Sequence, residues 1–214
     1  MDKMPIIALA NLKGGVGKST LAVSLAGALA PNSALIDADP QATASAWAEA
    51  GNLPFPVTES PLTGSNVEAW ITDALNTDAT YIVIDLPPML GDATAAALAI
   101  ADLAVIPVTA SGADLKATNR AIELIAAARE NRGDGKPAVL MVPSKVDIRT
   151  AAGAEIQAVL HDYGEPVGPV ISQRVAHADA FTAGLWIGDY AKGSAAHSEI
   201  KALASVAKRL AGRP

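Results

Sequence analysis

The chain has 214 residues, enough for one sizeable α/β domain spanning 1–214, and half of the residues are hydrophobic, which excludes an intrinsically disordered protein. The absence of cysteine excludes disulfides, thiolate metal sites and iron–sulfur clusters. A net charge of −6 argues against a surface that binds nucleic acid all over, and no apolar run is long enough to cross a membrane, so we expect a cytoplasmic protein.

Short apolar runs alternate with helix-like stretches along the chain. Strands are predicted at 6–10, 34–36, 81–84, 103–108, 138–142 and finally 167–171. Helices are predicted at 19–30, 41–50, 66–76, 92–100, 114–132, 150–163, 176–183 and 194–211, and a surface loop at 53–65. This alternation predicts an α/β fold with a doubly wound, mostly parallel sheet flanked by helices on both faces. Ligands of such folds bind at the carboxyl ends of the strands.

The first predicted strand leads into a glycine-rich loop, Lys13-Gly14-Gly15-Val16-Gly17-Lys18-Ser19-Thr20. Consecutive glycines let backbone N–H groups turn toward phosphate oxygens, and the following helix adds the favourable end of its dipole. Lys18 is predicted to reach the β- and γ-phosphates, and the Ser19 hydroxyl to bind Mg²⁺. The loop departs from the usual P-loop pattern at Leu12, where a glycine is expected, and it carries a second lysine, Lys13.

This loop resembles the deviant Walker A box of the ParA/MinD family of partitioning and positioning ATPases, and the resemblance extends over nearly the whole chain. It implies a P-loop NTPase that binds ATP and Mg²⁺ through residues 13–20. It also implies that Lys13 reaches across a homodimer interface to the nucleotide of the partner. A cation supplied in this way neutralises charge that develops on the γ-phosphoryl group, so we interpret both Lys13 and Lys18 as catalytic.

Two carboxylate motifs follow. Asp37 and Asp39 end the second predicted strand, and residues two apart on a strand point the same way. The stretch resembles the D-x-D-P-Q motif of the family, which implies that Asp39 activates or orients the attacking water. Asp37 would lie near the nucleotide, where it would support either the ligands of Mg²⁺ or the two lysines. Asp85 ends the third strand in a Walker B arrangement, in which the carboxylate holds Mg²⁺ through water.

The base of the nucleotide is less clearly specified. Ser144-Lys145-Val146-Asp147 comes close to the (Asn/Thr)-Lys-x-Asp signature of GTPases and departs from it at the first position. The family resemblance favours ATP, and GTP stays the alternative. We expect the base pocket to be lined by the loop at 144–147, beginning with Ser144, and by the segment at 107–113, beginning with Pro107.

The C-terminal region distinguishes two branches of the family. A MinD-like, membrane-associated division-site ATPase would use the helix at 194–211 as an amphipathic membrane anchor. Its apolar residues are small and include no aromatic, which favours docking of this helix against the sheet, so we expect no membrane binding. A ParA-like ATPase binds DNA non-specifically when ATP is bound. A solvated helix face is the alternative explanation of the basic residues. The candidate DNA contacts are Arg174, Lys192, Lys201, Lys208 and Arg209.

The resemblance therefore implies a switch. ATP and Mg²⁺ bind, two subunits form a homodimer, and the dimer gains affinity for DNA and associates with the nucleoid. A ParB-like or other cargo-adaptor protein then stimulates a weak ATPase activity, and the dimer dissociates. The cargo would be a plasmid, a chromosome region or a protein assembly. A metabolic kinase or ligase on the same loop is a third alternative, and it would need a pocket for a small-molecule acceptor.

Overall fold

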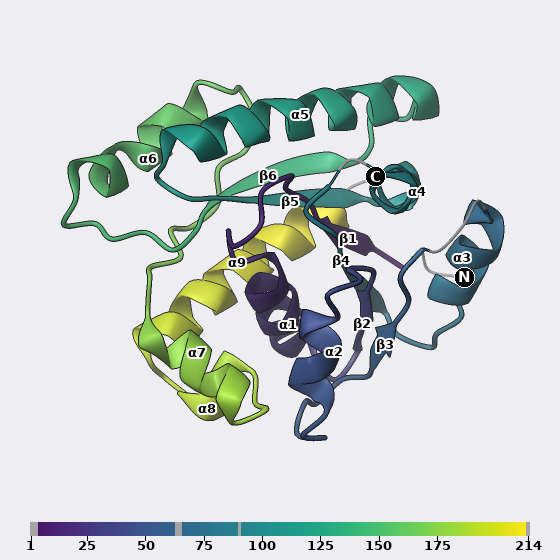
Figure 1. The fold of residues 1–214 in the computed structure, drawn as a ribbon, viewed down its shortest axis with the longest axis horizontal. Coiled ribbons are helices and arrows are strands. Elements are labelled where there is room, and N and C mark those ends of the chain that lie inside the picture. The colour runs from purple at the N-terminus through teal and green to yellow at the C-terminus, as the bar shows by residue number, and fades with distance from the viewer. Residues whose placement is uncertain (1–3, 63–65, 90, 213–214) are drawn as a thin grey trace.

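A six-stranded parallel sheet forms the centre of the computed structural model, which describes residues 4–62, 66–89 and 91–212, with the backbone alone at 112–114 (Figure 1). The strand order is β3-β2-β4-β1-β5-β6. Every neighbouring pair of strands runs parallel. The strands are β1 (Ile6–Leu9), β2 (Ser33–Asp37), β3 (Val57–Glu59), β4 (Tyr81–Asp85), β5 (Leu103–Val108) and β6 (Ala138–Pro143).

Helices cover both faces of the sheet because successive residues of each strand point to opposite sides. Ile7 and Leu9 of β1 pack into one apolar cluster, and Ile6 and Ala8 into another. The first face is covered by α1 (Lys18–Leu29), α2 (Thr43–Ala48), α7 (Val175–Thr182), α8 (Ile187–Tyr190) and α9 (Ala195–Ala211). The second is covered by α3 (Val67–Ala74), α4 (Asp92–Ile100), α5 (Gly112–Arg132) and α6 (Ala151–His161). The predicted doubly wound α/β fold is confirmed.

Two details of the predicted elements are wrong. The predicted strand at 167–171 makes only an isolated bridge, between Met141 and Val167. Its N–H groups donate to β6 from Gly168 and then from Ile171, and this three-residue step breaks the two-residue repeat of a ladder. The predicted loop at 53–65 contains the short edge strand β3, which pairs with β2 alone. Residues 63–65 of that prediction lie outside the described part of the chain. The four-residue helix α8 was not predicted.

Helix α9 packs against the sheet and α1, as the small size of its apolar residues predicts. Its buried positions recur at helical spacing and are Ala196, Ile200, Leu203, Ala204, Ala207 and Ala211. The apolar stripe that a membrane-binding helix would expose is therefore part of the core. Within the described ranges, the structure contains no helix with both the length and the apolar character needed to cross a bilayer.

The register of the three central strands gathers the predicted site residues at one edge of the sheet. Leu9, the last residue of β1, lies beside Asp85 of β4, and Asp85 lies beside Asp37 of β2. The glycine-rich loop begins just after Leu9, so it shares the carboxyl edge of the sheet with both aspartates. Figure 1 shows this edge between the α5–α6 layer and the α7–α8 pair.

Candidate nucleotide-binding site

The glycine-rich loop between β1 and α1 has a backbone that only glycine adopts easily. Gly15 has a φ of 79° and Gly17 a φ of 96°, both in the left-handed region. A Cβ added at Gly14 or Gly15 would meet nothing within 4 Å, so this backbone faces open space. Helix α1 begins at Lys18 with no side-chain cap on its first N–H groups. Open backbone and uncapped N–H groups are the features that an anionic phosphate requires.

Asn11 fastens the start of this loop, a role that was not predicted from the sequence. The residue is buried, and its Nδ2 donates to the Pro107 carbonyl at 2.7 Å. Its Oδ1 accepts from the backbone N–H of Lys13 at 3.1 Å. Pro107 therefore supports the phosphate loop from within β5. The only sequence signal for Asn11 is its place between a buried strand and the glycine run.

Asp85 is a fully buried carboxylate, and neither of its oxygens has a hydrogen-bond partner among the described residues. Burial raises its pKa to about 7, helped by the nearby Asp37 and Asp39 and opposed by the Ser19 hydroxyl and the Lys18 ammonium. An unpartnered buried carboxylate is costly to the fold. It fits a hydrated divalent cation, and Ser19 beside it could supply a hydroxyl ligand.

Asp37 and Asp39 are both buried, and they have different surroundings. Asp37 Oδ2 accepts from the backbone N–H and the hydroxyl of Ser45, at 2.8 and 2.9 Å, and its Oδ1 accepts from the Asp39 N–H. Asp37 therefore fixes α2 and the turn that carries Asp39. The Asp39 carboxylate itself accepts from the N–H of Gln41 through Oδ1, at 2.9 Å.

Lys18 is the buried cation of the site. Burial lowers its pKa, and the carboxylates of Asp85 and Asp39 counteract this effect. Three carboxylates against one buried lysine leave an excess of negative charge that favours a divalent cation beside the phosphates. No group of three His, Asp or Glu side chains with metal-ligand geometry occurs in the described ranges. Magnesium would therefore rely on phosphate oxygens, water and few protein ligands, as Mg²⁺ usually does.

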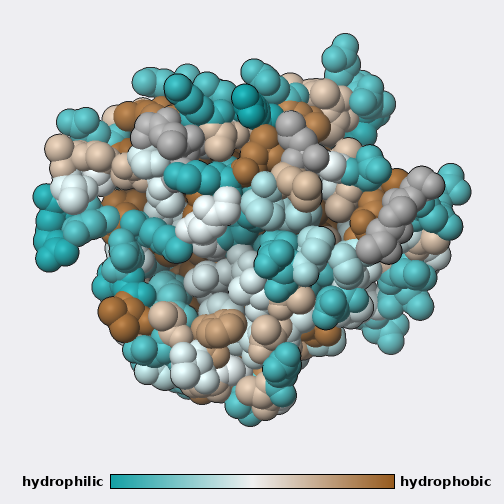
Figure 2. All heavy atoms as spheres, in the orientation of Figure 1, coloured by the Kyte–Doolittle hydropathy of each residue, from teal (hydrophilic) through white to brown (hydrophobic). Residues whose placement is uncertain are grey.

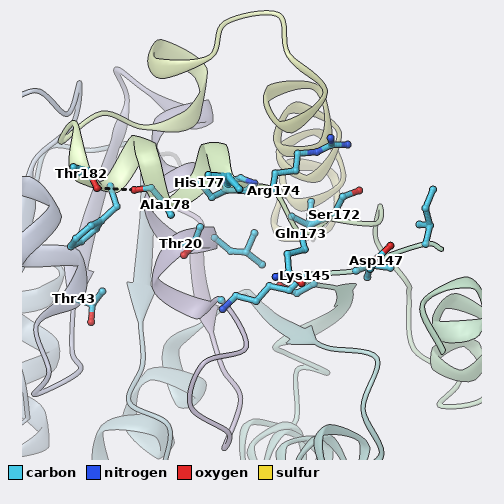
Figure 3. A pocket seen from close by; sticks show the side chains of 18 of the residues that line it. Thr20, Thr43, Lys145, Asp147, Ser172, Gln173, Arg174, His177, Ala178 and Thr182 are labelled. Atoms are coloured by element: carbon cyan, nitrogen blue, oxygen red, sulfur yellow. Dashed lines mark hydrogen bonds between the residues drawn. The ribbon is translucent and has the colours of Figure 1, made fainter. Parts of the chain in front are cut away.

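A cavity of about 1130 Å³ lies beside the phosphate loop. Its walls come from α1, α2, the loop after β6, and α7 with the segment that leads into it. Figure 3 shows Lys145 extending across the cavity toward the phosphate loop at the start of α1. Residues 144–147 line this cavity, whereas Pro107 is not among its lining residues. Ile148, Val175 and Phe181 line it and are exposed apolar residues. Figure 2 shows hydrophobic groups over α7, at the lower left, among hydrophilic neighbours.

The five candidate DNA contacts are distributed over three elements. Lys201, Lys208 and Arg209 are exposed on α9, and their spacing of seven and eight residues places them on one side of the helix. Lys192 is exposed in the turn before α9. Arg174 lies at the start of α7, where its Nη2 donates to Glu199 Oε1 at 2.7 Å. In Figure 3 its guanidinium extends toward α9, and Arg174 is also one of the residues that line the cavity. Arg174 is thus already paired, which the sequence did not reveal.

Comparisons with known proteins agree with this geometry. The chain is 31% identical over 188 residues to Protein ParA of Rhizobium radiobacter, covering 85% of this chain and 84% of the relative. It is 30% identical over 208 residues to the Maintenance of carboxysome distribution protein A of Halothiobacillus neapolitanus, covering 93% and 94%. Among solved structures, the ATP complex of a McdA variant from Cyanothece superposes with a TM-score of 0.73. That match covers 100% of this chain and 98% of the other, at 18% identity, and so supports the fold alone.

The sequence profile of the family described as CobQ/CobB/MinD/ParA nucleotide binding domain matches residues 7–185, from β1 to just beyond α7. This span contains the glycine-rich loop, the three buried aspartates and the cavity. The chain therefore belongs to the CobQ/CobB/MinD/ParA family of nucleotide-binding domains, with relatives among the ParA-type ATPases of partition and positioning.

Proposed function

We propose that this protein is an ATP-dependent dimerisation switch that partitions or positions a cargo. One observation carries the proposal: an open glycine loop, followed by the buried Lys18, lies at the same edge of the sheet as Asp85, whose buried carboxylate has no hydrogen-bond partner among the described residues. The loop suits the phosphates and Asp85 suits hydrated Mg²⁺. The adjoining cavity would take the base, with Ser144 on its wall.

Hydrolysis in this proposal depends on Asp39 and two lysines. Asp39 is held in position by Asp37 and can orient a water molecule near the γ-phosphate. Lys18 binds the phosphates within its own subunit. Lys13 of each subunit reaches the nucleotide of the other, so the triphosphate becomes part of the dimer interface. The exposed apolar residues at the cavity rim are consistent with a face that a second copy covers.

Triphosphate would hold the dimer together, and diphosphate would release it. Moving a dimer population from 1:99 to 99:1 requires a preference of about 5.5 kcal/mol for the closed state. Charge-assisted contacts from the two Lys13 residues are of a kind that can supply such a preference. In the dimer the basic residues of both α9 helices would act together on non-specific DNA, and a ParB-like or other adaptor protein would stimulate hydrolysis. The dimer would associate with the nucleoid while ATP is bound.

The test is ATP-dependent dimerisation, measured by light scattering with ATP, ADP and no nucleotide. We expect Lys13→Ala to bind ATP and remain monomeric, because no ammonium then reaches the nucleotide of the other subunit. Asp39→Ala is its counterpart: it should bind ATP and accumulate as a dimer, because hydrolysis no longer releases it. A wild-type protein that binds no ATP, or Lys13→Ala dimers as abundant as those of the wild type, would refute the proposal.

A further inference from the structure

Two side chains fasten the loop after β6 to the phosphate loop. Ser144 Oγ donates to the Val16 carbonyl at 2.8 Å, and Lys145 Nζ donates to the Gly15 carbonyl at 2.7 Å. Ser144 is buried, and a Cβ added at Gly17 would lie 3.0 Å from its Oγ, so the two loops are in close contact. The residues that follow Lys145 are therefore held at a fixed position relative to the phosphate loop.

The backbone of Asp147 is fixed from the other side by the start of α6. The hydroxyl and the N–H of Thr150 both donate to the Asp147 carbonyl, at 2.8 and 3.1 Å. Gly153 lies so close that an added Cβ would collide with the same oxygen. Asp147 also lines the cavity, as does Arg149. These contacts hold the backbone of Asp147, and with it the root of its side chain, at a fixed position on the cavity wall.

Arg149 occupies both oxygens of the Asp147 carboxylate. Oδ1 accepts from the backbone N–H and the Nε of Arg149, at 3.0 and 2.8 Å, and Oδ2 accepts from its Nη2 at 2.7 Å. The hydrogen bonds from Arg149 lower the pKa of Asp147 to about 2, so the carboxylate is ionised at neutral pH. Three hydrogen bonds from Arg149, two of them from its guanidinium, therefore occupy this ionised group.

A free carboxylate at this position would distinguish the two purines. Guanine presents neighbouring N–H donors on its Watson–Crick edge, which a carboxylate accepts as a pair, whereas adenine offers one amino group beside an acceptor nitrogen. With Arg149 in place, guanine would have to displace a bidentate, charge-assisted partner. Adenine needs no such exchange, because it gains little from the carboxylate.

We propose that the pair of Asp147 and Arg149 sets the base preference of this site. Arg149 occupies the Asp147 carboxylate, so that this carboxylate does not bind guanine. The inference rests on the proposed function, since it concerns the base of the same nucleotide. It also explains why a loop that comes close to the GTPase signature, Ser-Lys-Val-Asp, would occur in the ATP-binding protein of the proposed function. The Arg149 side chain is 86% exposed, so water screens the ionic attraction across the pair, and the effect comes from the hydrogen bonds that occupy the carboxylate.

The experiment measures the dissociation constants of Mg-ATP and Mg-GTP by competition against a fluorescent ATP analogue, for the wild-type protein and variants. Arg149→Ala should lower the Kd for GTP relative to that for ATP by about tenfold, the gain expected from one newly available bidentate contact to a base. Arg149→Gln is a second variant that should change the ratio in the same direction. Adding Asp147→Asn to Arg149→Ala should return the ratio to the wild-type value.

Arg120→Ala, which removes an exposed arginine from α5, is the matched control and should leave the ratio unchanged. The inference is overturned if the wild type binds GTP as tightly as ATP, or if Arg149→Ala leaves the ratio of the two constants unchanged. It is also overturned if the gain persists in the double variant. A wild type that binds neither nucleotide would instead refute the proposed function, so the two failures are distinguishable.

Discussion

Single residues in this site destabilise the nucleotide-free fold, and the proposed function gives them a role in binding. Asp85 is fully buried without a hydrogen-bond partner in the described structure, and its pKa is raised to about 7. A carboxyl group with a raised pKa stabilises the fold only while it is protonated. That contribution is complete below the unfolded pKa of about 4 and is lost as the pH rises through about 7. At pH 8 the ionised group therefore weakens the nucleotide-free protein.

Asp85→Asn should make the nucleotide-free protein more stable and the magnesium site weaker. The amide keeps the shape and removes the buried charge, so we expect a gain on the order of 2 kcal/mol in the free energy of unfolding at pH 8. Thermal unfolding with and without Mg-ATP measures both effects. The stabilisation by Mg-ATP should shrink in the variant, and an undiminished stabilisation would contradict the role of Asp85 at the metal.

We expect His177 on α7 to make the fold sensitive to acid. Both ring nitrogens are buried without a hydrogen-bond partner in the described ranges, and burial lowers the pKa of the imidazole. The charged groups that act on it are Glu199, which raises the pKa, and Arg174, which lowers it. Since the folded pKa lies below the unfolded value, the stabilisation is complete above about pH 6.5 and is lost as the pH falls below it.

His177→Gln should therefore flatten the loss of thermal stability between pH 7 and pH 5. The control is His161→Gln on α6, which replaces an exposed histidine and should leave the wild-type profile unchanged. Melting temperatures across this pH range test the expectation. Parallel profiles for the wild type and His177→Gln would show that the buried imidazole does not titrate with unfolding.

At the scale of elements, α1 connects the phosphate loop to the rest of the fold. Nine of its twelve residues are buried, because the sheet lies on one side and α9 and α8 lie on others. Gly27 permits a close approach of the Trp186 ring, with which a Cβ at that position would collide. Small residues in α1 are therefore required by packing, and the composition of the helix alone does not show which of them are critical.

Gly27→Ala should destabilise the protein by about 1–3 kcal/mol, since the methyl group forces the Trp186 ring out of place. The matched change on the same helix is Ser24→Ala. Ser24 is buried, and its hydroxyl has no hydrogen-bond partner in the described structure, so this change should be neutral or slightly stabilising. Chemical denaturation of both variants measures the difference, and equal losses of stability would contradict the packing argument.

At the scale of the whole molecule, the basic stripe on α9, formed by Lys201, Lys208 and Arg209, extends toward the edge of the sheet opposite the phosphate loop. The Lys208 ammonium lies 5.8 Å from the centre of the Tyr81 ring, and Tyr81 begins β4. This is the amino edge of the sheet, whereas the phosphate loop is at the carboxyl edge. Nucleotide would therefore influence DNA binding through dimerisation, which doubles the stripe, and not through direct contact with these residues.

Lys201→Ala combined with Arg209→Ala should weaken ATP-dependent retention on non-specific DNA. We expect the slope of log affinity against log salt to fall by about 0.9 for each DNA phosphate that the variant no longer neutralises. Lys116→Ala combined with Arg120→Ala removes the same two charges from α5, on the opposite face of the sheet, and should retain DNA as the wild type does. Equal weakening in both pairs would indicate a response to net charge and not a surface on α9.

The sequence by itself determined most of the strands and helices, with the exceptions of β3, α8 and the segment at 167–171. It also determined the position of the glycine loop and of the three aspartates at strand ends. These features depend on local spacing: apolar runs specify buried strands, and the glycines at 15 and 17 specify a left-handed backbone. The sequence also predicted that Lys201, Lys208 and Arg209 lie on one exposed side of a helix, because helical periodicity is a local property. The Asp37 and Asp39 motif also followed from spacing along one strand.

Only the tertiary structure decided which groups are paired. Ser144 and Val16 are 128 residues apart, and Arg174 and Glu199 are 25 apart, so their hydrogen bonds depend on how strands and helices come together. The edge strand β3 exists because β2 lies beside it, and the segment at 167–171 lacks a continuous ladder although its apolar pattern resembles a strand. Pairing across the fold depends on register and on available N–H groups, which local spacing does not encode.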